Sequence, residues 1–166
     1  SHLGRDTMSL FFARKWSPNS DLMRIARNDP SLNRVYWQYK GVGDDEIIKL
    51  AKVLRDNTHV TKVYLGDNSI SDVGVKDLAE RLQRNATITY LYLAGNKITD
   101  VGAKALAGML QTNATITEVY LNGNIITDVG AKALEDMLKI NATITHLGLG
   151  GNDIKTDTEQ KIYRLE

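Results

Sequence analysis

The chain has 166 residues, 42% hydrophobic and 25% charged, a composition typical of one globular domain rather than of a disordered chain. Its net charge of +1 gives no indication of a nucleic-acid or membrane surface. No apolar run approaches the roughly 18 residues of a membrane span. Because the chain also has no cysteine, we expect a reducing compartment and a cytoplasmic protein.

The first 31 residues do not follow the pattern of the rest. Residues 1–7 are expected to be an expression remnant ahead of a natural start at Met8. Residues 8–31 combine an apolar patch between Leu10 and Trp16 with a turn at Pro18 and a short helix. We expect this segment to be a helical cap, because the first repeat of a solenoid would otherwise leave its end exposed to water.

A repeat of 28 residues follows. Three rows of equal length, without insertions, begin at Thr58, Ala86 and Ala114. Such a period indicates a solenoid. A degenerate row begins at Leu32, and the row from Ala142 starts faithfully but then loses the pattern. The sequence therefore predicts repeats over residues 32–154 and, over residues 155–166, a degenerate helix with a polar face that closes the solenoid.

Each row contains two hydrophobic periods. Core positions that alternate, as in the segment from Val60 to Leu65, predict a short strand. The segment from Val75 to Leu82 places apolar residues at i, i+3, i+4 and i+7, which predicts an amphipathic helix of about ten residues. Strands stack about 4.8 Å apart and helices about 8–10 Å apart, so the stack must curve. We expect a right-handed α/β solenoid with about five parallel strands on the concave face and helices on the convex face.

Several polar columns recur with the repeat, and each has a structural explanation. Ser71 and its equivalents are expected to cap the helices, and Asn85 and its equivalents to end them in the left-handed conformation. The asparagine after each strand, such as Asn96, can satisfy backbone groups of the turn. Asp72, Asp100 and Asp128 start the helices, four residues before Lys76, Lys104 and Lys132, which stabilises helices. We therefore expect no metal site, no cofactor and no catalytic residue.

The motif L-x-x-L-x-L-x-x-N-x-I-x-D-x-G-x-x-x-L-x-x-x-L resembles the ribonuclease-inhibitor-like class of leucine-rich repeats. It is carried by Ile88, Leu91, Leu93, Asn96, Ile98, Asp100, Gly102, Leu106 and Leu110 and by their equivalents from about Leu32 to Ile154. The resemblance implies a protein-binding function. The segment from Asn28 to Leu32, followed by a short solenoid, is also similar to the C-terminal actin-binding domain of tropomodulins, a resemblance that covers the edge of the first repeat.

The strand positions that vary between rows point away from the core and define the candidate binding face. This face is predicted to comprise Arg34, Tyr36, Lys62, Tyr64, Tyr90, Tyr92, Glu118, Tyr120 and His146. Tyrosine is enriched at binding hot spots. However, aromatic cross-strand pairs also stabilise a sheet by about 0.2–1 kcal/mol each, so a purely structural role stays open. Charge changes from Arg34 and Lys62 at one end to Glu118 at the other, and this gradient could orient a partner.

We expect a non-catalytic module that binds a protein partner through this face, and the sequence identifies neither the partner nor an oligomeric state. Two other functions stay open. One is a regulator, either an actin-binding domain of the tropomodulin type or a GTPase activator of the Ran-activator type. The other is a scaffold without a specific ligand.

Overall fold

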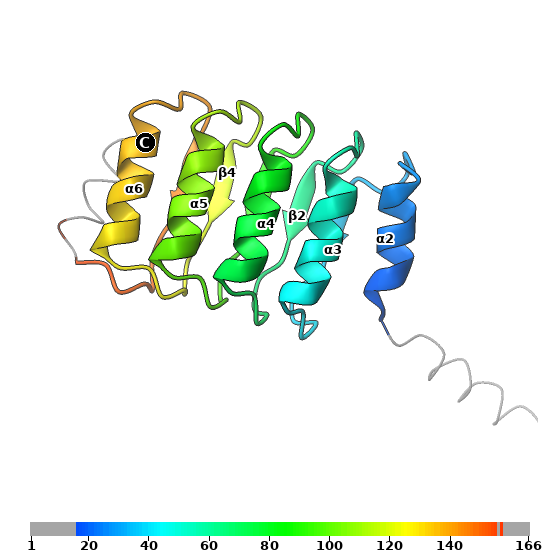
Figure 1. Cartoon of the computed structure of the whole chain (residues 1–166), viewed down its shortest axis with the longest axis horizontal. Coiled ribbons are helices and arrows are strands. Elements are labelled where there is room, and N and C mark those ends of the chain that lie inside the picture. The colour runs from blue at the N-terminus through cyan, green and yellow to red at the C-terminus, as the bar shows by residue number, and fades with distance from the viewer. Residues whose placement is uncertain (1–15, 156, 158–166) are drawn as a thin grey trace, which may run out of the picture.

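The structure is a computed structural model that describes residues 16–155 and residue 157. Its helices lie side by side in one layer, in chain order, in front of a layer of strands (Figure 1). The predicted expression remnant, the apolar patch before Trp16 and nearly all of the predicted C-terminal cap lie outside the described residues, so these domain limits stay predictions.

Strands and helices alternate strictly along the chain after the first helix. The elements are α2 (Pro18–Ala26), β1 (Arg34–Tyr36), α3 (Asp44–Leu54), β2 (Lys62–Tyr64), α4 (Asp72–Leu82), β3 (Tyr90–Tyr92), α5 (Asp100–Leu110), β4 (Glu118–Tyr120), α6 (Asp128–Leu138) and β5 (His146–Gly148). The five strands form one parallel sheet in the order β1-β2-β3-β4-β5. Equivalent residues of successive rows pair in register, as Val63 does with Leu91. The predicted leucine-rich-repeat solenoid is confirmed.

The hydrophobic core lies between the sheet and the helices. The core positions predicted for the row that starts at Thr58 are all buried, on the strand (Val60, Val63, Leu65) and on the helix (Val75, Leu78, Ala79, Leu82). Each strand is only three residues long, with its central residue buried. The rows are therefore held together by packing and by contacts outside the strands.

Helix α2 covers the first row. Ile25 is buried, and Trp16 packs edge-on against Trp37, with the ring centres 5.6 Å apart. The indole nitrogen of Trp37 donates to Asp21 of α2 at 2.8 Å, which satisfies a polar atom of an otherwise fully buried side chain. The described part of the N-terminal segment thus packs as a cap should.

Buried asparagines connect each row to the row before it. The side-chain nitrogen of Asn96 donates to the carbonyl oxygens of Leu65 and Leu93, at 3.0 and 3.1 Å. Its side-chain oxygen accepts from the amide of Ile70 at 3.1 Å. Equivalent bonds are made by Asn68, Asn124 and Asn152. The predicted role in the turn is confirmed, and the bonds to the preceding row extend it.

The interpretation of the helix-ending asparagines as left-handed residues is wrong. Among the described residues, the non-glycine positions with positive φ are Asn28, Tyr39 and Asp67. Asn85 is buried instead, donates to the carbonyl of Leu54 at 2.9 Å, and accepts from the amides of two residues that follow it. Asn113 and Asn141 make equivalent bonds. Their role is therefore to join rows, a second column of asparagines parallel to the first.

The aspartate column is structural, but not through lysine. Asp72 accepts hydrogen bonds from the amides of Thr99 and Gly102 in the next row, at 2.9 and 3.0 Å, and from the Thr99 hydroxyl at 2.5 Å. A Cβ at Gly102 would lie 2.6 Å from the Asp72 carboxylate, so only glycine fits at this position of the D-x-G motif. Thr99 also caps α5, as predicted, by accepting from the Val101 amide.

Replacing Asn96, which is 7% exposed, with alanine should lower the free energy of unfolding by about 3 kcal/mol. The loss would leave backbone groups of two rows buried without partners. Urea unfolding would measure it, with Asn19→Ala at an exposed position of α2 as the control, expected to change stability by less than about 0.5 kcal/mol. Equal stability of the two variants would contradict the structural role of this asparagine column.

Candidate functional site

The predicted binding face forms as a continuous surface on the side of the sheet away from the helices. In-register pairing places Arg34, Lys62, Tyr90, Glu118 and His146 in one row across the five strands. A parallel row contains Tyr36, Tyr64, Tyr92, Tyr120 and Gly148. All nine predicted side chains therefore share one face. Arg34, Tyr36 and His146 are exposed, and the other six are half-buried.

Five tyrosine rings on this face contact one another. Tyr36 stacks on Tyr64 with ring centres 4.7 Å apart, and Tyr64 lies 5.0 Å from Tyr90. Tyr120 continues the cluster, 5.4 Å from Tyr90 and 5.6 Å from Tyr92. Such offset or tilted pairs contribute about 0.5–1.5 kcal/mol beyond area burial. The cluster is therefore preorganised, because a partner would not have to order these rings on binding.

The charged residues of the face are tied to the tyrosines. Arg34 donates to the Tyr36 hydroxyl at 3.1 Å, and the Lys62 ammonium lies 5.6 Å above the centre of the Tyr90 ring. The Tyr120 hydroxyl donates to Glu118 at 2.9 Å. Positive charge at β1 and β2 and negative charge at β4 are thus held beside the aromatic rings, as the predicted gradient requires.

Two glycines shape the tyrosine cluster. Gly148 takes the position of a fifth ladder tyrosine, where a Cβ would collide with the side chains of Tyr120 and Asn122. Gly66 lies beneath Tyr92, whose ring would be only 2.5 Å from a Cβ at that position. The cluster therefore ends at β4, and its second row stays flat enough for Tyr92 to lie across it.

The threonines expected beside the tyrosines have an additional role. The hydroxyl of Thr89 donates to the carbonyl of Thr61 in the preceding row at 3.3 Å, and Thr117 and Thr145 repeat the contact. These hydroxyls thus extend the hydrogen bonding between the short strands. They contribute to the sheet as well as to the surface beside the tyrosines.

Sequence reasoning missed Tyr39 and Asp67, which lie in the turns after β1 and β2. Both have positive φ, 53° and 54°, where three later rows have Gly95, Gly123 and Gly151. The hydrogen bond between their side chains raises the pKa of the Tyr39 phenol. Tyr39 is 78% exposed. Two rows therefore keep a polar or aromatic side chain where glycine would be unstrained, and aligning the rows at this position would have revealed it.

Other candidate chemistries are not supported by the described residues. In the part of the chain that the structure describes, no three histidine, aspartate or glutamate side chains are grouped so that they could hold a metal ion. No described helix has the length and apolar character needed to cross a bilayer. The asparagines of two Asn-x-Thr sequences, Asn85 and Asn113, are buried and engaged through both ends of their amides, so they cannot accept a glycan as folded.

With this geometry in view, comparison with known proteins gives a family. The sequence model described as the TMOD/LMOD leucine-rich domain matches residues 17–126. The chain belongs to this family. The tropomodulin resemblance, seen in the sequence only at the edge of the first repeat, is thereby confirmed over most of the chain, and so is the leucine-rich repeat.

Two solved structures of this tropomodulin and leiomodin group share the fold. Leiomodin-1 actin-binding site 2 has 24% sequence identity and a TM-score of 0.80, covering 91% of this chain and 88% of that one. The tropomodulin C-terminal domain of Caenorhabditis elegans has 16% identity and a TM-score of 0.78, covering 90% of this chain and 91% of its own. No curated protein sequence matches the chain.

Alkaline titration should reveal the environment of Tyr90. Partial burial, together with the neighbouring tyrosines and Glu118, raises the pKa of the Tyr90 phenol from 10.0 to about 12. Its stabilising contribution is therefore complete below pH 10.0 and is lost as the pH rises towards 12. Ultraviolet absorbance of tyrosinate should show a late-titrating component that is missing from Tyr90→Phe. If the variant kept that component, the proposed environment of Tyr90 would be wrong.

Proposed function

We propose that this chain is a non-catalytic actin-binding module of the tropomodulin and leiomodin type, which binds its partner through the concave face. The family match is the observation that carries the proposal, because it covers residues 17–126 and thus four of the five strands. Leiomodin-1 actin-binding site 2, whose fold matches 91% of this chain, is by its name a segment that binds actin. Of the functions that the sequence left open, the actin-binding one is therefore favoured.

The physical character of the concave face supports its use as the binding surface. Its five clustered tyrosines offer a large contact area with few rotatable bonds, and their hydroxyls can form hydrogen bonds. Tyr36, at the open end of the cluster, is 53% exposed. The exposed Arg34 lies beside it and bonds its hydroxyl. An aromatic side chain next to a guanidinium is a combination enriched at binding hot spots.

A cytoskeletal partner agrees with the expectation of a cytoplasmic protein, which stays a prediction. A scaffold without a specific ligand also stays open, and the following two experiments distinguish it from the proposal. Both use actin co-sedimentation of the full chain.

Replacing both Arg34 and Tyr36 with alanine should weaken actin binding by about tenfold or more, because the pair is exposed and central to the proposed contact. The matched control is Ile48→Ala/Lys49→Ala on the convex face of α3, which also removes one apolar side chain and one cation. The control should bind like the wild type. Equal binding by both variants would exclude this end of the concave face, and absence of wild-type binding would leave the scaffold alternative.

Exchanging Lys62 and Glu118, as Lys62→Glu/Glu118→Lys, reverses the charge gradient and keeps the net charge. If the gradient orients the partner, binding should weaken and its dependence on salt should change, because the like charges brought together repel. Sedimentation at low and at moderate ionic strength would measure both effects. Unchanged affinity and unchanged salt dependence would refute the gradient.

A further inference from the structure

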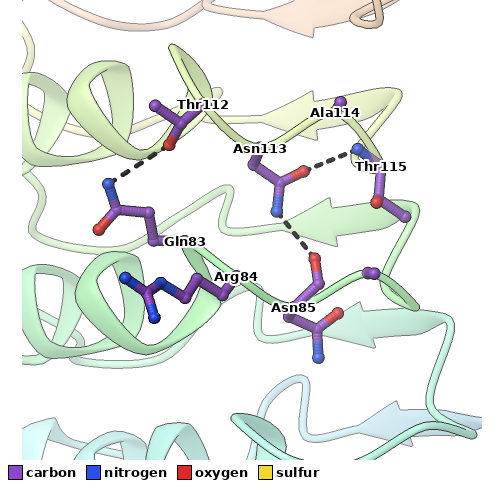
Figure 2. Close-up of a pocket in the computed structure, with 8 residues that line it drawn as sticks. Gln83, Arg84, Asn85, Thr112, Asn113, Ala114 and Thr115 are labelled. Atoms are coloured by element: carbon purple, nitrogen blue, oxygen red, sulfur yellow. Dashed lines mark hydrogen bonds between the residues drawn. The ribbon is translucent and has the colours of Figure 1, made fainter.

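A second surface lies at the C-terminal ends of the helices, away from the tyrosine cluster. Two hollows of about 540 and 370 Å³ adjoin there and share Gln83 and Arg84. The smaller hollow is also lined by Arg55, Glu80 and Arg81. The larger one continues over the turns that follow α4 and α5, as far as Thr115 (Figure 2). We call these two adjoining hollows the arginine groove.

The floor of the arginine groove is fixed. Figure 2 shows Gln83 reaching from the end of α4 to Thr112 at the end of α5, with a hydrogen bond of 3.3 Å. Asn113 holds the two turns together, since it donates to the Asn85 carbonyl at 3.2 Å and accepts from the Thr115 amide at 2.9 Å. A ligand would therefore meet a preformed surface rather than a loop that must order.

The arginines of the groove are not used in ion pairs. The salt bridges found among residues 16–155 and 157 involve other side chains. Arg55 and Arg84 are exposed and Arg81 is half-buried. Glu80 is the one carboxylate among the residues that line the two hollows. The groove thus has an excess of positive charge, although the whole chain is close to neutral.

The fold itself does not require this cluster. Basic residues in the last turn of a helix favour the negative end of its dipole, and α2, α3 and α4 have them in Arg24, Lys52 and Arg81. However, α5 and α6 have the same length as α3 and α4 and no basic residue in the last turn. The arginines therefore gather on one part of a repeating edge whose other part forms without them.

We propose that the arginine groove binds an acidic, extended segment of a protein partner. Guanidinium groups bind carboxylates through paired hydrogen bonds, and three of them face one open hollow. The adjoining hollow has small side chains at Ala86 and Ala114, which leave room for a peptide backbone between the turns. Glu80 within the lining disfavours a compact polyphosphate, whose charges are too dense to avoid it. The inference does not depend on actin binding.

The test uses a fluorescent peptide of alternating glutamate and alanine as the probe. Fluorescence anisotropy should show saturable binding to the wild type that weakens with salt. Arg81→Gln/Arg84→Gln should weaken it by about tenfold. The charge-matched control, Lys49→Gln/Lys104→Gln at exposed helix positions, should weaken it by less than about twofold. Amide shifts in nuclear magnetic resonance spectra should map to residues 80–86 and 112–115, and circular dichroism would verify that each variant is folded.

Four results would overturn the proposal. The first is no saturable binding of the glutamate–alanine peptide. The second is equal weakening by the arginine and lysine variants, which would indicate non-specific charge attraction. The third is peptide-induced shifts on the strand face instead of the groove. The fourth is tighter binding of tripolyphosphate, or of vesicles that contain phosphatidylserine, than of the peptide, since this would assign the groove to phosphate chemistry.

Discussion

The backbone at the two ends of every row must be satisfied inside the protein, and the rest of the structure depends on this constraint. Strands of three residues cannot supply enough hydrogen bonds to hold the rows together. The two asparagine columns and the aspartate column supply the remainder, each reaching across one row boundary. Because these contacts need equivalent atoms at a fixed offset, the rows must keep one length. The insertion-free period of 28 residues is the sequence expression of that requirement.

The sequence was sufficient wherever a property repeats with the rows. Alternation identified the strands and the buried positions, and it also placed all nine candidate residues on one face. It failed where the partner of a side chain lies in another row. Asn85 looked like a helix terminator because its own row offers that explanation, while its acceptor is Leu54 in the row before. The arginine groove was missed for the same reason, since it exists only when the ends of α3, α4 and α5 are packed together.

The two proposed surfaces differ in how they depart from the repeat. On the concave face, four rows share a tyrosine and the charges beside it change sign from Arg34 to Glu118. On the helix edge, a basic group is present on some rows and absent from α5 and α6. In both places the residues that vary are those that the core and the row boundaries leave free. A repeating scaffold thus separates the positions that determine shape from those that can be specialised.

The direction of the polar contacts has a consequence for how such a protein grows. At each boundary, an asparagine of the later row accepts from the earlier one, as Asn96 does from Ile70, while an aspartate of the earlier row accepts from the later one, as Asp72 does from Thr99. Every row therefore carries both halves of the joint, one for each neighbour. Gene duplication of a single 28-residue unit creates a complete new joint at once, without compensating substitutions. The near-identity of the rows that begin at Ala86 and Ala114 is what a lineage that lengthens by such copying would leave behind.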